Sequence, residues 1–387
     1  MSKITDVNAR EILDSRGEPT LEVEISTDDG LMATDSVPSG ISTGSFESIP
    51  VKPEIAVNTI NQTIKPKIIG LDPLDQFGID QLMLDMDGTG DKSSLGANTI
   101  LGVSLALSRV AALTEKMPLY WYINKLYSRI CGEEIEPSLP TPMMVMIEGG
   151  KHAKNKLCLQ EILVIGKLEH GKKIWHTLRE LITSQGLEPD LGLEGGFSPK
   201  LNYDEDAIDL LQSAIEISKL SVSKDIMIGL DIAANYCNIS NEDILHMLDN
   251  FPIYSIEDPA PEDKIDHWAE LKLELDRKGK DYLLVGDDLF VTSKERLEAG
   301  IENFAANAMI VKVNQTGTLT ETLKVISLAK KADFVHILSH RSGETMDSYI
   351  SDLAVGTAAK YLKAGAPFAS EREIKYKRLE EIASELT

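Results

Sequence analysis

IMIGLD at residues 226–231 and IYSIED at residues 253–258 are two of six short apolar runs that each end near a polar or charged residue. The other four are LLVGDD at 283–288, AMIVKVN at 308–314, VHILSH at 335–340 and, less clearly, YLKAG at 361–365. The polar residues at these ends are Asp231, Glu257, Asp287, Lys312, His340 and Lys363, at separations of 26, 30, 25, 28 and 23 residues. Helical patterns fill the intervals, so one strand and one helix repeat along the chain.

This repeat predicts the fold class. Continuous apolar runs are typical of strands buried on both faces, as in parallel sheets. A strand–helix period sustained over this length predicts a β/α barrel, whose catalytic groups lie at the carboxyl ends of its strands. A doubly wound open sheet is the structural alternative, although no glycine-rich nucleotide fingerprint follows an early strand.

The sequence before the repeat has a different pattern. TLEVEISTDDGLMATDSVP at 20–38 alternates apolar and polar residues around Asp28–Asp29–Gly30 and predicts a hairpin. SGISTG at 39–44 predicts a loop, either a lid that closes over a phosphate or a linker. Helical patterns then continue as far as the acidic, proline-rich segment 132–142. We therefore expect an α+β domain at residues 1–134 and the barrel at 135–387.

Composition limits the class of protein. A formal net charge of −23 over 387 residues argues against nucleic acid or an anionic membrane as the main partner, but not against a small phosphorylated substrate. The three cysteines, an odd number without paired spacing, predict free thiols in a reducing cytoplasm. The first residues lack the apolar core of a signal peptide. The apolar stretch 95–113 is interrupted by polar residues and predicts a buried helix rather than a membrane span.

Three acids, Asp231, Glu257 and Asp287, occupy the same place in consecutive strand–helix units. Each could be the N-cap of the following helix, but capping does not require this regularity. Hard oxygen ligands that converge at a barrel mouth suit Mg²⁺. Lys312 then lies beside them, either as a neutralising partner or as a base whose pKa is lowered by metal charge and burial.

Further candidates come from three segments. HRSGET at 340–345 places Arg341 and Ser342 where a cation and a hydroxyl suit a phosphate, and Lys363 adds a cation fit for a substrate carboxylate. Glu161 and Glu194 have contexts in which a carboxyl can be buried and its pKa raised, as a general acid needs. Either glutamate could equally be a turn or core-edge acid.

Several motifs in order resemble the enolase family over nearly the whole chain. They include AREILDSRGEPTLEVE, VPSGISTG, LGANTILGVSLA, EGGFSP, SIEDP, VGDDLFVT, KVNQTGTLTET, SHRSGET and GAPFASERE. The resemblance implies an N-terminal α+β domain followed by an irregular eight-stranded α/β barrel. It also implies a cytoplasmic hydro-lyase of glycolysis and gluconeogenesis that reversibly dehydrates 2-phosphoglycerate to phosphoenolpyruvate through an enediolate, and that forms homodimers or homo-octamers.

The resemblance also implies two Mg²⁺ ions and a role for each site residue. The first ion would be held by Asp231, Glu257 and Asp287, and the second by Ser42 with the substrate phosphate. Lys312 would be the base, and Glu194, assisted by Glu161, would protonate the leaving hydroxyl. The remaining contacts would come from His152 on a closing loop, Arg341 and Ser342 at the phosphate, and His340 and Lys363 at the substrate.

The chain departs from the family at its lids and beside the proposed acid. Phe46 stands at a usual histidine, and the stretch after it is shortened. Glu148 and Lys151 stand where the family has Asn and Ser, and the Asp-Asn-Asn run after His152 is KNK. Leu193 replaces an Asp before Glu194. The sequence therefore indicates a shortened, divergent member, for which two alternatives are a lyase acting on a related phospho- or phosphono-carboxylate and a catalytically idle binding protein.

Overall fold

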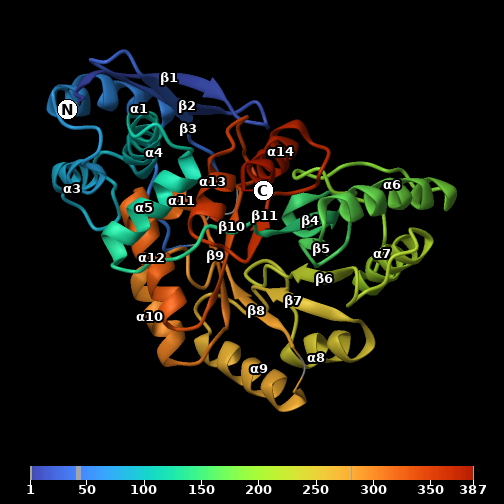
Figure 1. The fold of residues 1–387 in the computed structure, drawn as a ribbon. Coiled ribbons are helices and arrows are strands. Elements are labelled where there is room, and N and C mark those ends of the chain that lie inside the picture. Colours follow the sequence, from blue (N-terminus) through green and yellow to red (C-terminus); the bar gives the residue numbers. More distant parts are fainter. Residues whose placement is uncertain (1, 41–44, 280, 387) are drawn as a thin grey trace.

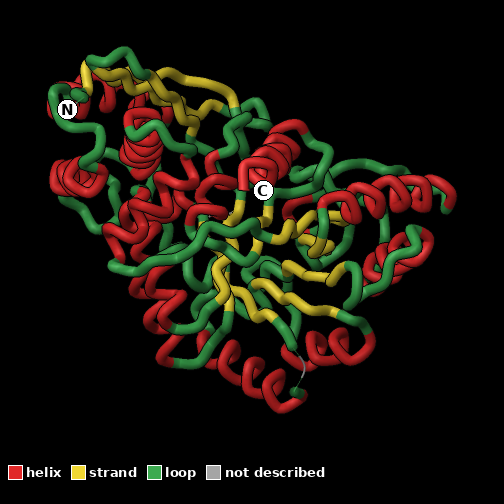
Figure 2. Tube along the Cα trace, in the orientation of Figure 1, coloured by secondary structure: helices red, strands yellow, loops and turns green. Residues whose placement is uncertain are grey.

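The computed structural model of the protein describes residues 2–40, 45–279 and 281–386. Figures 1 and 2 show a small sheet with helices at one side and a barrel of strands surrounded by helices. The predicted fold class is confirmed, since a three-stranded N-terminal sheet with helices precedes a closed eight-stranded barrel.

The N-terminal sheet is an antiparallel meander of β1 (Ile4–Leu13), β2 (Pro19–Thr27) and β3 (Met32–Ser36). The predicted hairpin joins β2 to β3: Ser26 pairs with Met32, and the Thr27 N–H donates to the Leu31 carbonyl at 2.9 Å. Gly30 lies in the turn with φ +82°, a conformation that glycine adopts without a steric penalty. The sheet buries one face because its apolar residues alternate.

Helical segments follow this sheet in the chain, and several of them cover its buried face. They are α1 (Pro53–Thr59), a π-helical segment (Ile60–Ile64), α2 (Lys65–Ile68), α3 (Gln76–Asp87), α4 (Ala97–Thr114) and α5 (Leu119–Cys131). Helix α4 packs against β2 and β3. Gly102 permits this close approach, because a Cβ at that position would lie 2.7 Å from a methyl group of Val23.

Helix α4 contains residues 97–113 of the apolar stretch 95–113. Within the part of the chain that the structure describes, it is the one helix long and apolar enough to cross a membrane. Of this helix, 78% is buried inside the protein, which agrees with the predicted buried helix. The segment between α5 and β4 has no helix or strand, and the domain boundary at residue 134 stays a prediction.

Eight strands close the barrel in the order β10-β11-β4-β5-β6-β7-β8-β9. They are β4 (Thr141–Glu148), β5 (Glu161–Gly166), β6 (Ile226–Asp231), β7 (Ile253–Glu257), β8 (Leu283–Gly286), β9 (Ala308–Val311), β10 (Val335–Ser339) and β11 (Tyr361–Lys363). The last six correspond to the six apolar runs. Strands β4 and β5 complete the eight.

Strand β5 departs from the parallel arrangement that the apolar runs indicated. It is antiparallel to both of its neighbours, β4 and β6, whereas all other barrel pairs are parallel. The short connection 149–160 contains only a 3₁₀ turn (Gly150–His152), and a short connection between adjacent strands makes a hairpin. Glu161 therefore begins its strand at the end of the barrel where Asp231 finishes its own.

The remaining helices surround the barrel. They are α6 (Leu168–Ser184), α7 (Asp204–Ile217), α8 (Asn241–Asn250), α9 (Ile265–Lys278), α10 (Lys294–Glu302), α11 (Val313–Thr316), α12 (Leu319–Lys331), α13 (Tyr349–Gly356) and α14 (Ser370–Leu386). In Figure 1 the N-terminal sheet and helices α8 and α9 lie on opposite sides of the barrel.

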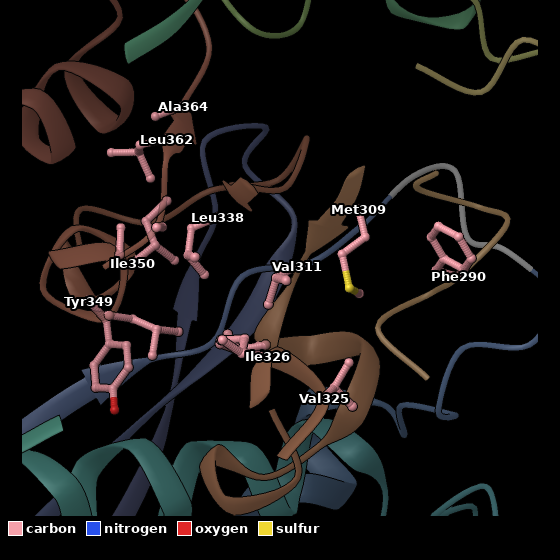
Figure 3. Close-up of a cluster of buried hydrophobic side chains, with 14 of the residues drawn as sticks. Phe290, Met309, Val311, Val325, Ile326, Leu338, Tyr349, Ile350, Leu362 and Ala364 are labelled. Atoms are coloured by element: carbon pink, nitrogen blue, oxygen red, sulfur yellow. The ribbon is translucent and has the colours of Figure 1, made fainter. Parts of the chain in front are cut away.

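Alternation along the strands divides the core in two. One set of strand residues, such as Val145, Leu163, Val285 and Ile310, forms a cluster of its own, as expected for the barrel interior. The alternate residues join the larger core under the helices. Figure 3 shows part of that layer, where strand residues such as Val311 meet Ile326 and other helix residues. Fully burying one such side chain contributes about 1.5–3 kcal/mol.

The prediction of free thiols is wrong for two of the three cysteines. Cys158 and Cys237 form a disulfide, with Cα atoms 5.3 Å apart, and Cys131 is the free cysteine among the described residues. The bonded pair is 79 residues apart in sequence. Sequence spacing could not reveal the bond, because the two cysteines come together only when β5 and β6 pair along the barrel wall.

We expect the Cys158→Ser variant to have a free energy of unfolding lower by about 2–4 kcal/mol, because the unfolded chain loses a long covalent loop. Urea unfolding of the unreduced protein measures this, and Cys131→Ser is the matched control with a smaller effect. Thiol titration of denatured, unreduced protein should find one reactive thiol per chain. Three reactive thiols would contradict the disulfide.

Candidate active site

The six polar strand ends that the sequence predicted converge at one end of the barrel. Asp231, Glu257 and Lys363 are the last residues of β6, β7 and β11. Asp287, Lys312 and His340 directly follow β8, β9 and β10. Register brings neighbours together, since Asp231 pairs with both Glu257 and Glu161. The regular spacing therefore did mark one end of the barrel.

The alternative that these acids cap helices does not hold. The residues at the N-caps of α8, α9 and α10 are Ser240, Lys264 and Ser293. Ser240 and Ser293 accept backbone N–H groups with their side chains, which leaves the strand-end acids free of that task.

One cavity collects nearly all the predicted site residues. It is lined by His152, Gln160, Glu161, Glu194, Asp231, Asp287, Lys312, Ser339, His340, Arg341, Ser342 and Lys363. Glu257 lies beside it, with Oε2 2.7 Å from the Lys363 ammonium nitrogen. Ser42, the predicted ligand of a second ion, lies outside the described residues.

Lys363 lies among three acids of this cavity. Its Nζ is 2.7 Å from Glu257, 3.0 Å from Glu161 and 3.2 Å from Asp231. Burial alone would lower the pKa of this amine, but the nearby carboxylates hold it well above its usual range. Lys363, which the sequence predicted to bind the substrate, thus also neutralises part of the charge of these acids.

Lys312 contacts Asp287, and its amine also borders the cavity. Burial lowers the pKa of Lys312, but the charge and hydrogen bond of Asp287 and the charge of Glu257 together raise it by more, so the net shift is upward. The lowered pKa expected from the sequence depends on the charge of bound metal ions and stays a prediction. The lysine neutralises Asp287 and faces the cavity, so its position serves both interpretations made from the sequence.

Glu194 lies between two histidines. His340 Nε2 is 2.8 Å from one oxygen of Glu194, and His152 Nδ1 is 3.8 Å from the other and 3.2 Å from Glu161. Arg372 donates to His340 Nδ1 at 2.7 Å, and a guanidinium has no acceptor, so His340 carries a proton on Nε2, the nitrogen 2.8 Å from Glu194.

The predicted burial of Glu194 is confirmed, but the predicted direction of its pKa is wrong. Burial raises that pKa, but the charges of His340 and His152 hold it well below its usual range. For His152, burial would lower the pKa, but the charge of Glu194 and the hydrogen bond and charge of Glu161 are the main causes that raise it to about 9. A nearby protonated histidine stabilises the ionised form of Glu194, and the sequence alone does not show which histidines lie near it.

Arg341 and Ser342 lie at the cavity edge toward the N-terminal domain. Arg341 Nη1 donates to Glu47 and Asn314, both at 3.0 Å, so an acid from the first lid region holds the predicted phosphate cation. The Arg372 side chain donates to the carbonyls of Arg341 and Ser342 at 2.6 and 2.8 Å. These contacts fix the direction in which both residues face.

The acids fit a divalent cation by their chemistry. Asp231, Glu257 and Asp287 offer only hard oxygen donors, which Mg²⁺ prefers. Across residues 2–40, 45–279 and 281–386, no donor reaches the buried Oε1 of Glu257. Asp287 also belongs to a second group, with Asp258 and Asp288, whose oxygens lie within 4.8 Å of one another.

The departures from the family pattern have partners of their own. The Phe46 ring lies 4.1 Å from the Arg296 guanidinium, and the Lys151 ammonium lies 3.5 Å from the Tyr236 ring centre. The second contact joins the same two loops as the disulfide. The segment that carries Phe46 and the connection 149–160 are therefore each held against another part of the barrel domain, by contacts that the departing residues themselves make.

Gln160 and Ser339 line the cavity but were missed from the sequence. Gln160 Nε2 donates to Asp231 at 3.3 Å. A search for polar residues at strand ends could not find Gln160, because its strand enters the barrel from this side. Arg372 and Glu47 were also missed; Arg372 lies in the motif GAPFASERE, whereas no quoted motif contains Glu47.

Comparison with protein-family models gives two matches. The model described as "Enolase, N-terminal domain" matches residues 4–123, and the model "Enolase, C-terminal TIM barrel domain" matches residues 136–250 and 238–387. Together the matches cover nearly all of the chain, and in the same order.

We expect His152 to titrate near pH 9, which NMR of the seven histidines can measure with His152→Gln for assignment. The folded pKa exceeds the ordinary 6.5, so protonated His152 stabilises the fold fully below about pH 6.5. That contribution, roughly 3 kcal/mol by linkage, is lost as pH rises through about 9. Glu161→Gln should lower the pKa of His152, and an unchanged value would contradict the assigned contact.

Proposed function

The chain belongs to the enolase family, and from this premise we propose that it catalyses the magnesium-dependent, reversible dehydration of 2-phosphoglycerate to phosphoenolpyruvate. The observation that carries the proposal is that a lysine and a glutamic acid, Lys312 and Glu194, border one cavity from separate parts of the barrel. Elimination of water needs one group to remove a proton and another to supply one.

In this proposal Lys312, as the neutral amine, takes the proton from the carbon that bears the phosphate. The electron pair forms the double bond, and the hydroxyl on the next carbon leaves as water with a proton from Glu194. In the reverse direction the ionised Glu194 takes a proton from water. The low pKa of Glu194 suits this hydration step, whereas dehydration requires its protonated form.

Asp231, Glu257 and Asp287 would hold the first Mg²⁺, and Ser42 with the substrate phosphate the second. When bound, the ions would supply positive charge where the substrate carboxylate becomes more negative. Arg341 and Ser342 would bind the phosphate. His152, His340 and Lys363 would fix the remaining polar groups and exclude water from the reacting carbons.

A second candidate is a lyase that acts on a related phospho- or phosphono-carboxylate. The observation in its favour is that the departures gather at the lids, where Phe46 packs on Arg296 and Lys151 packs on Tyr236. The residues proposed for metal binding and proton transfer do not differ. A role in glycolysis, a cytoplasmic location and a homodimer or homo-octamer belong to the same proposal.

We expect the protein with Mg²⁺ to form phosphoenolpyruvate from 2-phosphoglycerate, followed by ultraviolet absorbance. Lys312→Ala should lower kcat by about 10²–10⁴-fold, since it removes the general base. Lys294→Ala is the control, because Lys294 is an exposed lysine on α10. Absence of turnover by the wild-type protein, with turnover of a phosphono-carboxylate analogue, would favour the second candidate.

Mg²⁺ affinity tests the metal ligands separately from catalysis. We expect Asp287→Ala to weaken Mg²⁺ binding at least about tenfold by calorimetry, because a direct ligand is lost. Asp209→Ala, which removes an exposed acid on α7, controls for general charge. Equal affinity of the Asp287→Ala variant and the wild type would overturn the metal-site assignment.

A further inference from the structure

Glu148 is a fully buried acid at the end of β4 that has no role in the proposed reaction. It does not line the cavity of the candidate site. Both of its oxygens lie 3.1 Å from the Glu194 backbone nitrogen, and Oε1 also accepts the Gly196 N–H at 2.6 Å. A buried carboxyl is therefore held by the backbone of the residue that carries the candidate acid.

The turn 192–196 is shaped around this carboxyl group. Gly195 has φ +84°, which lets the N–H groups on either side of it point toward the same carboxyl group. A Cβ at Gly192 would lie 2.4 Å from Glu148 Oε2, and one at Gly196 would lie 3.1 Å from Oε1. The two glycines leave the space that the Glu148 side chain occupies.

The backbone of Glu148 is also held by hydrogen bonds. Its N–H donates to the Phe197 carbonyl at 2.8 Å, and its carbonyl accepts from Asn155 at 2.8 Å. Glu148 thus joins β4, the loop that carries His152 and the turn that carries Glu194. A change at its carboxyl group is transmitted directly to the Glu194 backbone.

We propose that Glu148 is a positioning residue for Glu194: its buried carboxyl group fixes the turn from which the Glu194 side chain extends, and the two acids act as one coupled pair. The kinetic part of this inference rests on the proposed function. Glu148 never touches substrate, so its effect on the reaction is indirect.

Electrostatics supports the coupling. Burial, and next the charge of Glu194, raise the pKa of Glu148 to about 8. The charged groups close to Glu194 come from several elements and include His340, His152, Arg372, Lys363, Glu161 and Glu148. Of these, Glu148 is the one that also bonds to the Glu194 backbone. As Glu148 ionises, its charge favours the protonated form of Glu194 that dehydration requires.

The test compares Glu148→Gln with wild-type protein and with Glu188→Gln, which removes an exposed acid from the same connection. With 2-phosphoglycerate and Mg²⁺, Glu148→Gln should lower kcat at least about tenfold, because the turn shifts, and change KM less than about threefold. The ratio of wild-type to variant kcat should rise about threefold or more as pH increases through about 8. A merely structural role would give a ratio independent of pH.

Histidine NMR tests the coupling without substrate. Glu148→Gln should lower the pKa of His152, because Glu148 is one of the acids that raise it, and Glu188→Gln should leave it unchanged. Wild-type kcat equal to that of Glu148→Gln, a ratio that does not vary with pH, or an unchanged His152 titration each overturns the proposal. No turnover by any form overturns the proposed function alone, and the NMR result then decides this inference.

Gly192→Ala provides a second variant if Glu148→Gln does not fold. Its added methyl group would displace the Glu148 carboxyl, so the same loss of kcat with little change in KM is expected. Full activity of folded Gly192→Ala with the wild-type pH profile would overturn the positioning role.

Discussion

The ammonium group of Lys363 lies among the carboxylates of Glu161, Asp231 and Glu257, which come from three adjacent strands. Three buried carboxylates repel one another, and removing one partner from a buried ion pair costs about 3–5 kcal/mol. The lysine reaches them from β11, elsewhere on the barrel wall, so closure of the barrel and neutralisation of the acids depend on each other. Lys312 repeats this arrangement at Asp287. The strands, their register and the candidate metal site all depend on this balance of buried charge.

The cavity and the side chains beside it have two different electrostatic environments. On one side, oxygen donors cluster around lysines and fit a hard cation. On the other, Glu194 is held ionised by His340 and His152, while Glu148 is held from ionising until about pH 8. The two neighbouring glutamates thus have pKa values on opposite sides of neutrality. The charges of His340 and His152 account for the low pKa of Glu194, and burial with the charge of Glu194 accounts for the raised pKa of Glu148. The protonation state of each of these side chains therefore depends on the charges of the others and not on that residue alone.

Much of this could be predicted from the sequence, because parallel strands bring equivalent positions together. The end of each apolar run identified Asp231, Glu257, Asp287, Lys312, His340 and Lys363, and the hairpin at Gly30 followed from local turn chemistry. Strand β5 carried no such signal, since an antiparallel strand has its beginning rather than its end at the mouth, so Gln160, the residue just before β5, was missed. The pKa directions of Glu194 and Lys312, and the Cys158–Cys237 bond, depend on contacts between distant segments. No local pattern records those contacts.

The reversed direction of β5 also bears on how such a protein can diverge. A parallel neighbour would need a helical crossover, and its length would be constrained by the outer layer. Here β4 and β5 are joined by a hairpin connection at the mouth itself, outside the helix layer. Residues there can be exchanged, inserted or deleted while the strands keep their register. His152, Lys151 and Cys158 all lie in this one connection, so its sequence can change around the cavity while Lys312 and Glu194, the groups proposed for proton transfer, stay on other segments.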